Sequence, residues 1–272
     1  YDSGDFAALL NKAEAATGNF ELRKMEAKSR GRLRGLGFSN YVKGVRAGAG
    51  EAARIEISRD GDATVLIGNQ SNGQGHETIY CQIIAGKLGL SMNKVRVFQG
   101  DTEEIAYGTG TGACRSIIVG GSAVAETTDR IIDIGRGVAS GLLEVAPEDI
   151  EFTDGSYVVS GTDRSIPVGE IVASAGGIVA RDRFTPSAFT FPNGTHCCEL
   201  EVDPDTGAVQ VDRYIMVHDC GTPVNPVLAE AQLYGGVVHG LGQAFSEHII
   251  YAEETGQILT GSFMDFGLPR AG

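Results

Sequence analysis

The N-terminal part of the chain changes from helical to strand-like hydrophobic spacing. Apolar residues recur at helical intervals from Phe6 to Ala13, and a basic segment with further apolar positions follows. This pattern predicts two helices, which we expect to stop at Gly35 or Gly37. Between residues 38 and 67, short runs rich in valine and isoleucine surround the turn sequence RDGD, as is typical of antiparallel strands in a small sheet.

Two glycine-rich loops follow, and each stands between a strand pattern and a helix pattern. The loop GNQSNGQGHE leads into a helix that ends near Leu88, where Gly89 provides the stop. The strand KVRVFQGD leads into the loop AYGTGTGACRS and then a long helix from about Ile117 to Leu143. Pro147 ends this helical stretch, and EDIEFTDGSYVVS alternates like two strands around an Asp-Gly turn.

The remaining residues predict a short helix, a hairpin, a long helix and a second hairpin. The short helix covers about Val168 to Ala175, and the strands CCELEVD and AVQVDRYIMVHD are joined by the turn DPDTG. CGTPVNPVLAEAQ opens a glycine-rich helix that runs to about Ala244, and EHIIYAEETGQILTG predicts the final hairpin. Because helices and strands alternate irregularly, we expect an α+β fold with mixed sheets and packed helices. We divide it into two parts, residues 1–165 and 166–272.

Composition narrows the class of protein and its partners. Hydrophobic residues make up 42% and charged residues 21%, as in soluble globular proteins. The 22 basic and 35 acidic residues give a net charge of −13, which disfavours nucleic acid and anionic membranes as partners. The five cysteines form no C-x-x-C pair, so their spacing indicates neither a zinc nor an iron-sulfur site and favours a reducing cytoplasm. No apolar run approaches the roughly 18 residues of a membrane span.

The first glycine-rich loop offers a place for an anion. Gln74, Gly75 and His76 stand directly before a predicted helix, where glycine lets backbone N–H groups approach a ligand and the helix N-terminus favours negative charge. Such a loop suits a phosphate or an oxo ligand. The alternative interpretation is a tight strand-to-helix turn with a solvated glutamine.

The second loop, residues 107–116, interleaves glycines with hydroxyl side chains and one arginine, again directly before a helix. Exposed N–H groups, hydroxyls and a guanidinium together suit a pyrophosphate. The loop lacks both the Gly-Lys-Ser/Thr of a P-loop and the G-x-G-x-x-G arrangement of a dinucleotide site. A flexible surface loop is the alternative.

The third candidate is the glycine-rich helix near the C-terminus. Each interior glycine costs a helix about 0.5 to 1 kcal/mol relative to alanine, so these glycines suggest a close approach to another element or to a ligand. At helical spacing, one polar face is formed by Gln232, Gly236, His239 and Gln243. The other face is formed by Leu233, Val237 and Leu241. Ordinary helix packing with a buried glutamine is the alternative.

Other polar residues give weaker signals. His196, His218 and His248 have no partner at metal-ligand spacing, and we interpret them as structural or surface residues. Cys197 and Cys198 are adjacent in a predicted strand and would point to opposite faces, so they cannot readily share a metal.

Seven segments, taken in order, resemble the molybdopterin-binding subunit of the molybdenum hydroxylases, the family of xanthine dehydrogenases, aldehyde oxidases and aerobic carbon monoxide dehydrogenases. They are YDSGDF; GQGHET with QIIAGKLGL and VRVFQGDT; YGTGTGACRSIIVGGSAV; ELEVDPDTGAVQVDRY; DCGTPVNP; QLYGGVVHGLGQA; and GSFMDFGLPRA. The GQGHET form is closer to the bacterial carbon monoxide dehydrogenase-like branch than to animal xanthine oxidase.

This resemblance implies a molybdenum cofactor, a cytosine dinucleotide form of molybdopterin, whose dithiolene holds the molybdenum without a direct protein ligand. Gln74, Gly75 and His76 would approach the molybdenum and pterin end, and Gln232 would hydrogen-bond the pterin. The second loop would hold the pterin and phosphate through Thr111, Gly112, Ala113, Cys114, Arg115 and Ser116.

The resemblance also implies a function. The chain would belong to a multisubunit oxidoreductase that oxidises a small substrate with an oxygen from water and passes electrons to 2Fe-2S clusters and FAD on an iron-sulfur subunit and a FAD subunit. Such a role suits a chain with no evident nucleophile, because the cofactor carries the difficult chemistry. The alternative is a noncatalytic anion-binding or scaffold domain that keeps the fold without the cofactor.

Two departures from the family pattern concern the reaction. The family's Gly-Gly-Phe-Gly and Ala-Tyr-Arg loops should precede YDSGDF, and the glutamate that acts as general base in a Gly-x-Gly-Glu segment should follow Gly272. We therefore expect a fragment or one piece of a divided subunit, incomplete at both ends, whose catalytic residue and substrate-selecting loop lie on the remaining segments of that subunit.

Overall fold

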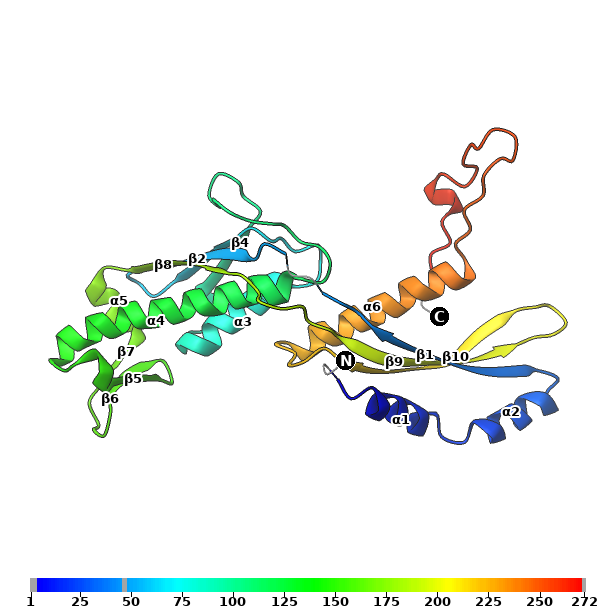
Figure 1. Ribbon diagram of the computed structural model, residues 1–272, viewed down its shortest axis with the longest axis horizontal. Helices are drawn as coiled ribbons and strands as arrows, with labels where there is room; N and C mark the ends of the chain where they lie inside the picture. The colour runs from blue at the N-terminus through cyan, green and yellow to red at the C-terminus, as the bar shows by residue number, and fades with distance from the viewer. Residues whose placement is uncertain (1–3, 46–47, 271–272) are drawn as a thin grey trace. The chain divides into compact units, whose positions relative to one another are not determined.

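The computed structural model describes residues 4–45 and 48–270 of the chain (Figure 1). Residues 1–3 of the YDSGDF segment and residues 46–47 of the expected strand region lie outside the described residues. The same holds for residues 271–272, which include the last alanine of GSFMDFGLPRA.

Tertiary contacts divide the described residues into two units. One contains the described residues of 1–71 and 76–222, and the other contains those of 72–75 and 223–272. The boundary expected after residue 165 falls within strand β7 (Ser165–Pro167). The division of a cofactor-binding region at that residue stays a prediction.

An antiparallel sheet with the order β1-β9-β10 carries the two N-terminal helices of the first unit. Its elements are α1 (Phe6–Thr17), α2 (Phe20–Ser29), β1 (Leu33–Val42), β9 (Asn193–Val202) and β10 (Val209–Asp219). Each helix begins at a capping side chain, because Asp5 accepts a hydrogen bond from the Ala8 N–H at 2.9 Å and Asn19 accepts one from the Leu22 N–H at 3.0 Å.

The expected helix stop at Gly35 or Gly37 is wrong. Helix α2 ends at Ser29, and both glycines lie within β1, where they pair with Leu200 and Cys198 of β9. Pairing with the distant strand β9 gives these residues interstrand hydrogen bonds and overrides the local helical pattern. The strands expected over residues 38–67 therefore do not form one sheet, since β1 joins β9 whereas β2 and β3 join each other.

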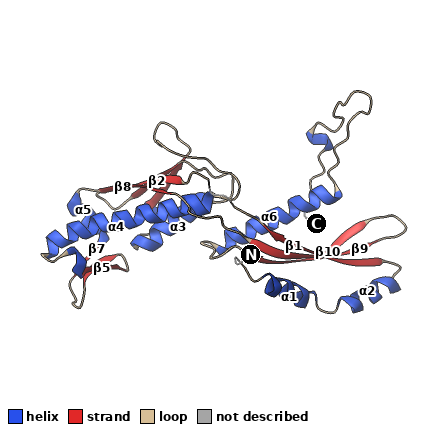
Figure 2. Cartoon of the chain, viewed as in Figure 1, coloured by secondary structure: helices blue, strands red, loops and turns tan. Residues whose placement is uncertain are grey.

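The second sheet of the first unit has the order β4-β3-β2-β8, and helices α3 and α4 pack on it (Figure 2). Its elements are β2 (Glu51–Ile57), β3 (Ala63–Ile67), α3 (His76–Leu88), β4 (Val95–Gln99), α4 (Ser122–Leu143) and β8 (Ile178–Phe184). Strands β3 and β4 are parallel, whereas β2 is antiparallel to both of its neighbours. Alternate residues of β2 are buried, and Ile55 joins Ile84 and Ile131 in the core between sheet and helices.

A small antiparallel sheet and a short helix extend the first unit beyond α4. They are β5 (Ile150–Thr153), β6 (Ser156–Val159), β7 (Ser165–Pro167) and α5 (Val168–Ala175). The expected turn between the first two strands is confirmed, with Asp154 and Gly155 at φ values of 48° and 75°. The short helix has the expected bounds. Single turns of other helix types are a π-helix at Ile117–Gly121 and 3-10 helices at Met92–Lys94 and Pro147–Asp149.

The second unit is built on helix α6 (Pro226–Phe245), which begins at the capping side chain of Asn225. The final hairpin expected after this helix is reduced to one bridge between Tyr251 and Ile258, followed by a 3-10 helix at Phe263–Asp265. Helices and mixed sheets together confirm the expected α+β fold. Over the part of the chain that the structure describes, no helix combines the length and apolarity needed to cross a membrane.

Candidate functional site

Both glycine-rich loops leave the same edge of the four-stranded sheet. Strand β3 ends at Ile67 and β4 at Gln99, and these two residues are partners in a parallel ladder. Because parallel neighbours end at the same edge of a sheet, the segments that follow them begin side by side. The first of these segments contains Asn69 and Gln70, and the second leads to the GTGTGACRS loop.

Two hydrogen bonds tie the segment after β3 to the second loop. The Thr111 hydroxyl donates to the Gln70 carbonyl oxygen at 2.5 Å, and the Asn69 side chain donates to the Ser116 carbonyl oxygen at 3.4 Å. Asn69 is held in turn by α3, since the Tyr80 hydroxyl donates to its Oδ1 at 2.6 Å. The hydroxyls of Thr111 and Ser116, both predicted site residues, lie 3.4 Å apart.

The middle of the second loop has a backbone conformation that non-glycine residues rarely adopt. Ala113 and Cys114 have φ values of 51° and 60°, and the Arg115 N–H donates to the Gly112 carbonyl oxygen at 3.1 Å, which closes a tight turn. Left-handed backbone at such residues costs free energy and concentrates at ligand sites and switch regions. Lys43 Nζ lies 3.0 Å from Cys114 Sγ and brings a cation beside the turn.

Arg115 holds the loop against the residue before β2. Its Nη2 donates to the Gly50 carbonyl oxygen at 2.9 Å and its Nη1 donates to the Thr109 carbonyl oxygen at 3.2 Å. Its Nε is buried and has no hydrogen-bond partner among the described residues. An unpaired buried donor costs about 1 to 3 kcal/mol, so a bound acceptor fits this position.

His76 places a second unpaired polar atom at this end of α3. The imidazole is only 5% exposed and its ring centroid lies 5.8 Å from that of Tyr80. Its Nδ1 is buried without a partner in residues 4–45 and 48–270. Burial lowers the pKa of His76, so the ring is neutral at pH 7 and Nδ1 can donate or accept a hydrogen bond according to the tautomer.

Gln74 and Gly75 belong to the second unit, where they lie beside the start of α6. Gly75 has a φ of 78°, and a Cβ on it would lie 2.9 Å from Leu228 Cδ1, so both conformation and space require glycine. The Gln74 side chain accepts a hydrogen bond from the Asn72 N–H. Gln232 follows Leu228 by one helical turn on the same side of α6, and its side chain is exposed.

The two predicted faces of α6 differ in burial as expected. Leu233, Val237 and Leu241 are half-buried, whereas the polar face that contains Gln232 is exposed. Among the helix glycines, Gly242 is packed, because a Cβ there would lie 3.1 Å from Pro269 Cδ. A Cβ on the others would meet no described atom within 4 Å, which leaves a flat surface along the helix at Gly235, Gly236 and Gly240.

The histidines and cysteines of the three-stranded sheet have structural surroundings. His196 Nδ1 lies 3.0 Å from the Tyr214 hydroxyl, and the rings of Tyr41 and His218 stack at 5.8 Å. Cys197 is buried and Cys198 is half-buried, in line with side chains on opposite faces of β9. Among the described residues, no group of three or more His, Cys, Asp or Glu side chains could hold a metal ion.

The sequence interpretation missed one residue of this site, Glu51. Its side chain is fully buried, and its Oε2 accepts a hydrogen bond from the Thr109 N–H at 3.2 Å. A signal was present, because Glu51 shares the inward-facing parity of β2 with Ala53 and Ile55. An acidic residue at an inward position needs a buried partner, and the second loop supplies it.

The family match and the sequence relatives of this chain agree with each other. Residues 12–272 match the family described as molybdopterin cofactor-binding domain. The chain is 35% identical to the 6-hydroxypseudooxynicotine dehydrogenase complex subunit gamma of Paenarthrobacter nicotinovorans, with 100% of this chain and 36% of that protein covered. It is 33% identical to the carbon monoxide dehydrogenase large chain of Afipia carboxidovorans, with 100% and 37% covered.

The fold agrees with these sequence relatives. The structure is similar to a crystal structure of Cu,Mo-CO dehydrogenase in its carbon monoxide reduced state, with a TM-score of 0.92 and 32% sequence identity. That similarity covers 100% of this chain and 38% of the other. The chain therefore spans a little over a third of the length of the relatives that it matches.

Proposed function

Because the chain belongs to the molybdopterin cofactor-binding domain family, we propose that it holds the molybdenum cofactor in the large subunit of a molybdenum hydroxylase. The observation that carries this proposal is the second loop, where left-handed backbone and the unpaired Arg115 Nε meet at one sheet edge. His76 Nδ1 adds an unpaired buried atom at the helix that leaves the same edge. These features fit a large anionic ligand with many acceptor atoms.

The proposed site residues form two groups, which contact different parts of this cofactor. We propose that the pyrophosphate and pterin of a cytosine dinucleotide form are held by Thr111, Gly112, Ala113, Cys114, Arg115 and Ser116. Gln74, Gly75 and His76 serve the molybdenum and pterin end, and Gln232 donates a hydrogen bond to the pterin. The bound cofactor supplies the redox chemistry, and the chain positions it through these contacts.

The proposed activity is oxidation of a small substrate with an oxygen from water, as part of a multisubunit complex. Electrons pass to 2Fe-2S clusters and FAD on an iron-sulfur subunit and a FAD subunit. Support comes from the relatives, which include a subunit of a dehydrogenase complex and a carbon monoxide dehydrogenase large chain. The cytoplasm stays the proposed location, on the cysteine composition alone.

Metal and pterin analysis of the natively assembled protein tests the proposal. We expect molybdenum and a pterin dinucleotide to copurify with it. Replacement of Gln74 or Gln232 by alanine should lower cofactor affinity about fivefold, because one hydrogen bond is worth about 1 kcal/mol. Gln210→Ala is the control, since this glutamine is exposed on β10. Natively assembled protein that contains neither molybdenum nor pterin would favour the alternative, a scaffold domain that keeps the fold without the cofactor.

A further inference from the structure

Glu51 is a fully buried carboxylate beneath the second loop. It begins strand β2 and faces inward, with 0% of its surface exposed. Transfer of a carboxylate from water into the protein interior is unfavourable unless polar groups replace the lost hydration. Glu51 therefore needs hydrogen-bond donors around its carboxylate.

Both carboxylate oxygens of Glu51 accept hydrogen bonds. Oε1 accepts from the Ala52 N–H at 3.1 Å, and Oε2 accepts from the Thr109 N–H at 3.2 Å, with Thr109 Oγ1 3.4 Å away. An ionised carboxylate is a strong acceptor at both oxygens. A glutamine would direct its NH2 group toward one of these N–H groups and lose that bond, and protonation of the glutamate would weaken it, because one oxygen becomes a hydroxyl.

Backbone contacts around Glu51 fix the position of the second loop. We call the contacts of Gly50 and Glu51 with Thr109 and Arg115 the clasp. Gly68 and Gly108 pack so tightly that a Cβ on Gly108 would lie 2.5 Å from Gly68 Cα. On the other side, Thr109 Oγ1 donates to the Gly50 carbonyl oxygen at 2.9 Å, and Arg115 Nη2 donates to the same oxygen at 2.9 Å. The start of β2 thus holds both ends of the segment between Thr109 and Arg115.

We propose that Glu51 is a positioning residue, whose carboxylate sets the conformation in which the 109–116 loop receives the cofactor. It acts through Thr109 and does not itself touch the ligand. The expected effect on cofactor retention rests on the proposed function. The contacts between Glu51 and the loop do not depend on it. Among residues 4–45 and 48–270, the charged or titratable groups that face Glu51 are the Arg115 guanidinium and the Tyr80 phenol.

Hydrogen exchange at the Thr109 amide, measured on the natively assembled protein, tests the clasp. In Glu51→Gln this amide should exchange at least about fivefold faster than in the wild type at pH 7, because its bond to an ionised acceptor is lost or weakened. Glu56→Gln is the matched control, since it makes the same change in the same strand at an outward position. Equal exchange of the Thr109 amide in wild type and Glu51→Gln would overturn the proposal.

A pH series on the wild type separates positioning from general structural damage and does not depend on any variant folding. Burial raises the pKa of Glu51, so the clasp should loosen at a higher pH than the titration of ordinary glutamates. After correction for intrinsic exchange, the wild-type rate at Thr109 should approach the Glu51→Gln rate as the pH falls, while the variant rate stays flat. A wild-type rate with no such pH dependence would contradict the role of the charge.

Cofactor retention distinguishes failure of this inference from failure of the proposed function. If the wild type retains molybdenum and pterin, Glu51→Gln should lose them at least about fivefold faster during gel filtration, and Glu56→Gln should not. A loosened loop with unchanged retention would overturn the positioning role while the proposed function stands. Absence of cofactor from the wild type would instead contradict the proposed function, and the exchange data would still decide whether Glu51 holds the loop.

Discussion

At the residue scale, one buried hydrogen bond links helix α3 to the candidate site. Asn69 and Tyr80 are almost completely buried, and the Tyr80 hydroxyl donates to Asn69 Oδ1 at 2.6 Å. Burial raises the pKa of the Tyr80 phenol, so the hydroxyl keeps its proton and stays a donor. Asn69 can then direct its amide nitrogen toward Ser116, at the start of the helix that follows the loop.

Tyr80→Phe should lower the free energy of unfolding by about 1 to 3 kcal/mol, because it leaves a buried acceptor on Asn69 without a donor. Tyr234→Phe is the control, since that hydroxyl bonds Glu230 at an exposed position and its loss should leave the free energy of unfolding nearly unchanged. Urea denaturation measures both. Equal stability of the two variants would show that the buried bond contributes nothing.

At the element scale, helix α4 contains glycines with opposite surroundings. Gly135 is buried against β6, and a Cβ there would overlap the Tyr157 hydroxyl, which donates to the Ile132 carbonyl oxygen at 3.1 Å. Gly137 lies two residues later on the exposed side, and a Cβ there would meet no described atom within 4 Å. Gly135 is therefore required by packing, whereas Gly137 only weakens the helix.

Alanine at these two positions should have effects of opposite sign. Gly135→Ala should destabilise the protein by about 1 to 3 kcal/mol, because the tyrosine must move from its packed position. Gly137→Ala should stabilise it by about 0.5 to 1 kcal/mol through helix propensity. Chemical denaturation of the two variants measures the pair, and a stabilised Gly135→Ala would refute the close packing of α4 on β6.

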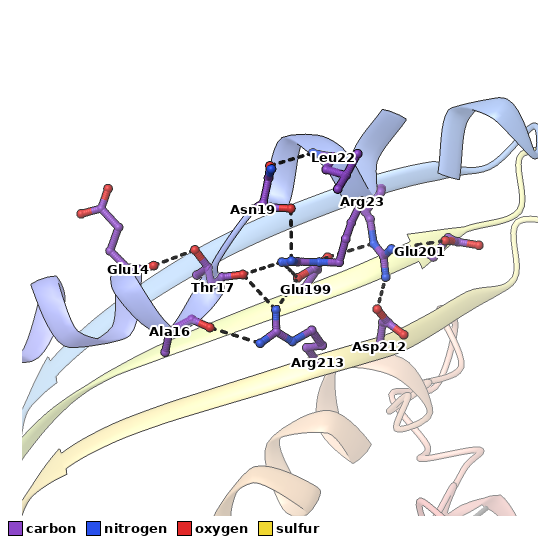
Figure 3. Close-up of polar contacts among 11 residues, drawn as sticks. Glu14, Ala16, Thr17, Asn19, Leu22, Arg23, Glu199, Glu201, Asp212 and Arg213 are labelled. Carbon is purple, nitrogen blue, oxygen red and sulfur yellow. Dashed lines mark hydrogen bonds and ion pairs between the residues drawn. The ribbon is translucent and has the colours of Figure 1, made fainter. Parts of the chain in front are cut away.

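At the scale of the whole molecule, a buried carboxylate joins segments that are distant in sequence. Glu199 of β9 is 1% exposed, and Arg23 of α2 donates to it at 2.7 and 2.8 Å (Figure 3). Arg34 Nε lies 3.0 Å from Glu199 Oε1, and Arg213 Nη1 lies 3.8 Å from Oε2. This ion-pair network connects helix α2 with all three strands of the sheet.

Glu199→Gln should lower the free energy of unfolding by about 1.5 to 3 kcal/mol at pH 7, because the buried carboxylate that Arg23, Arg34 and Arg213 share loses its charge and its charge-assisted hydrogen bonds. The hydrogen bond from Arg23 lowers the pKa of Glu199 below its unfolded value of about 4.3. Its contribution is therefore present above that unfolded value and is lost as the pH falls through the lower folded pKa.

Unfolding measured at pH 7 and in acid tests this dependence. The gap between wild type and Glu199→Gln should narrow as Glu199 becomes protonated. Glu14→Gln, on the exposed side of α1, should behave like the wild type at both pH values. A gap that does not change with pH would assign the loss to packing instead of charge.

The sequence predicts a structural feature correctly where that feature depends on residues that are close together in the chain. The helix at Val168–Ala175 and the turn at Asp154 and Gly155 depend on residues near each other in the chain, and both have the expected form. The expected final hairpin is reduced to one bridge between Tyr251 and Ile258. Alternating apolar and polar residues form a strand only where a neighbouring strand provides hydrogen-bond partners. The residues around Gly35 form a strand instead of a helix end, because β9 provides the hydrogen-bond partners.

The order of strand, glycine loop and helix, together with the residues of the three candidate segments, could be read directly from the chain. Family membership follows from the same motifs, because they are contiguous stretches whose chemistry does not depend on distant neighbours. The pairing of β1 with β9, the burial of Glu51 under Thr109 and the unpaired atoms of Arg115 could not. These features join residues far apart in sequence, and their free energy arises only when the folded chain removes both partners from water.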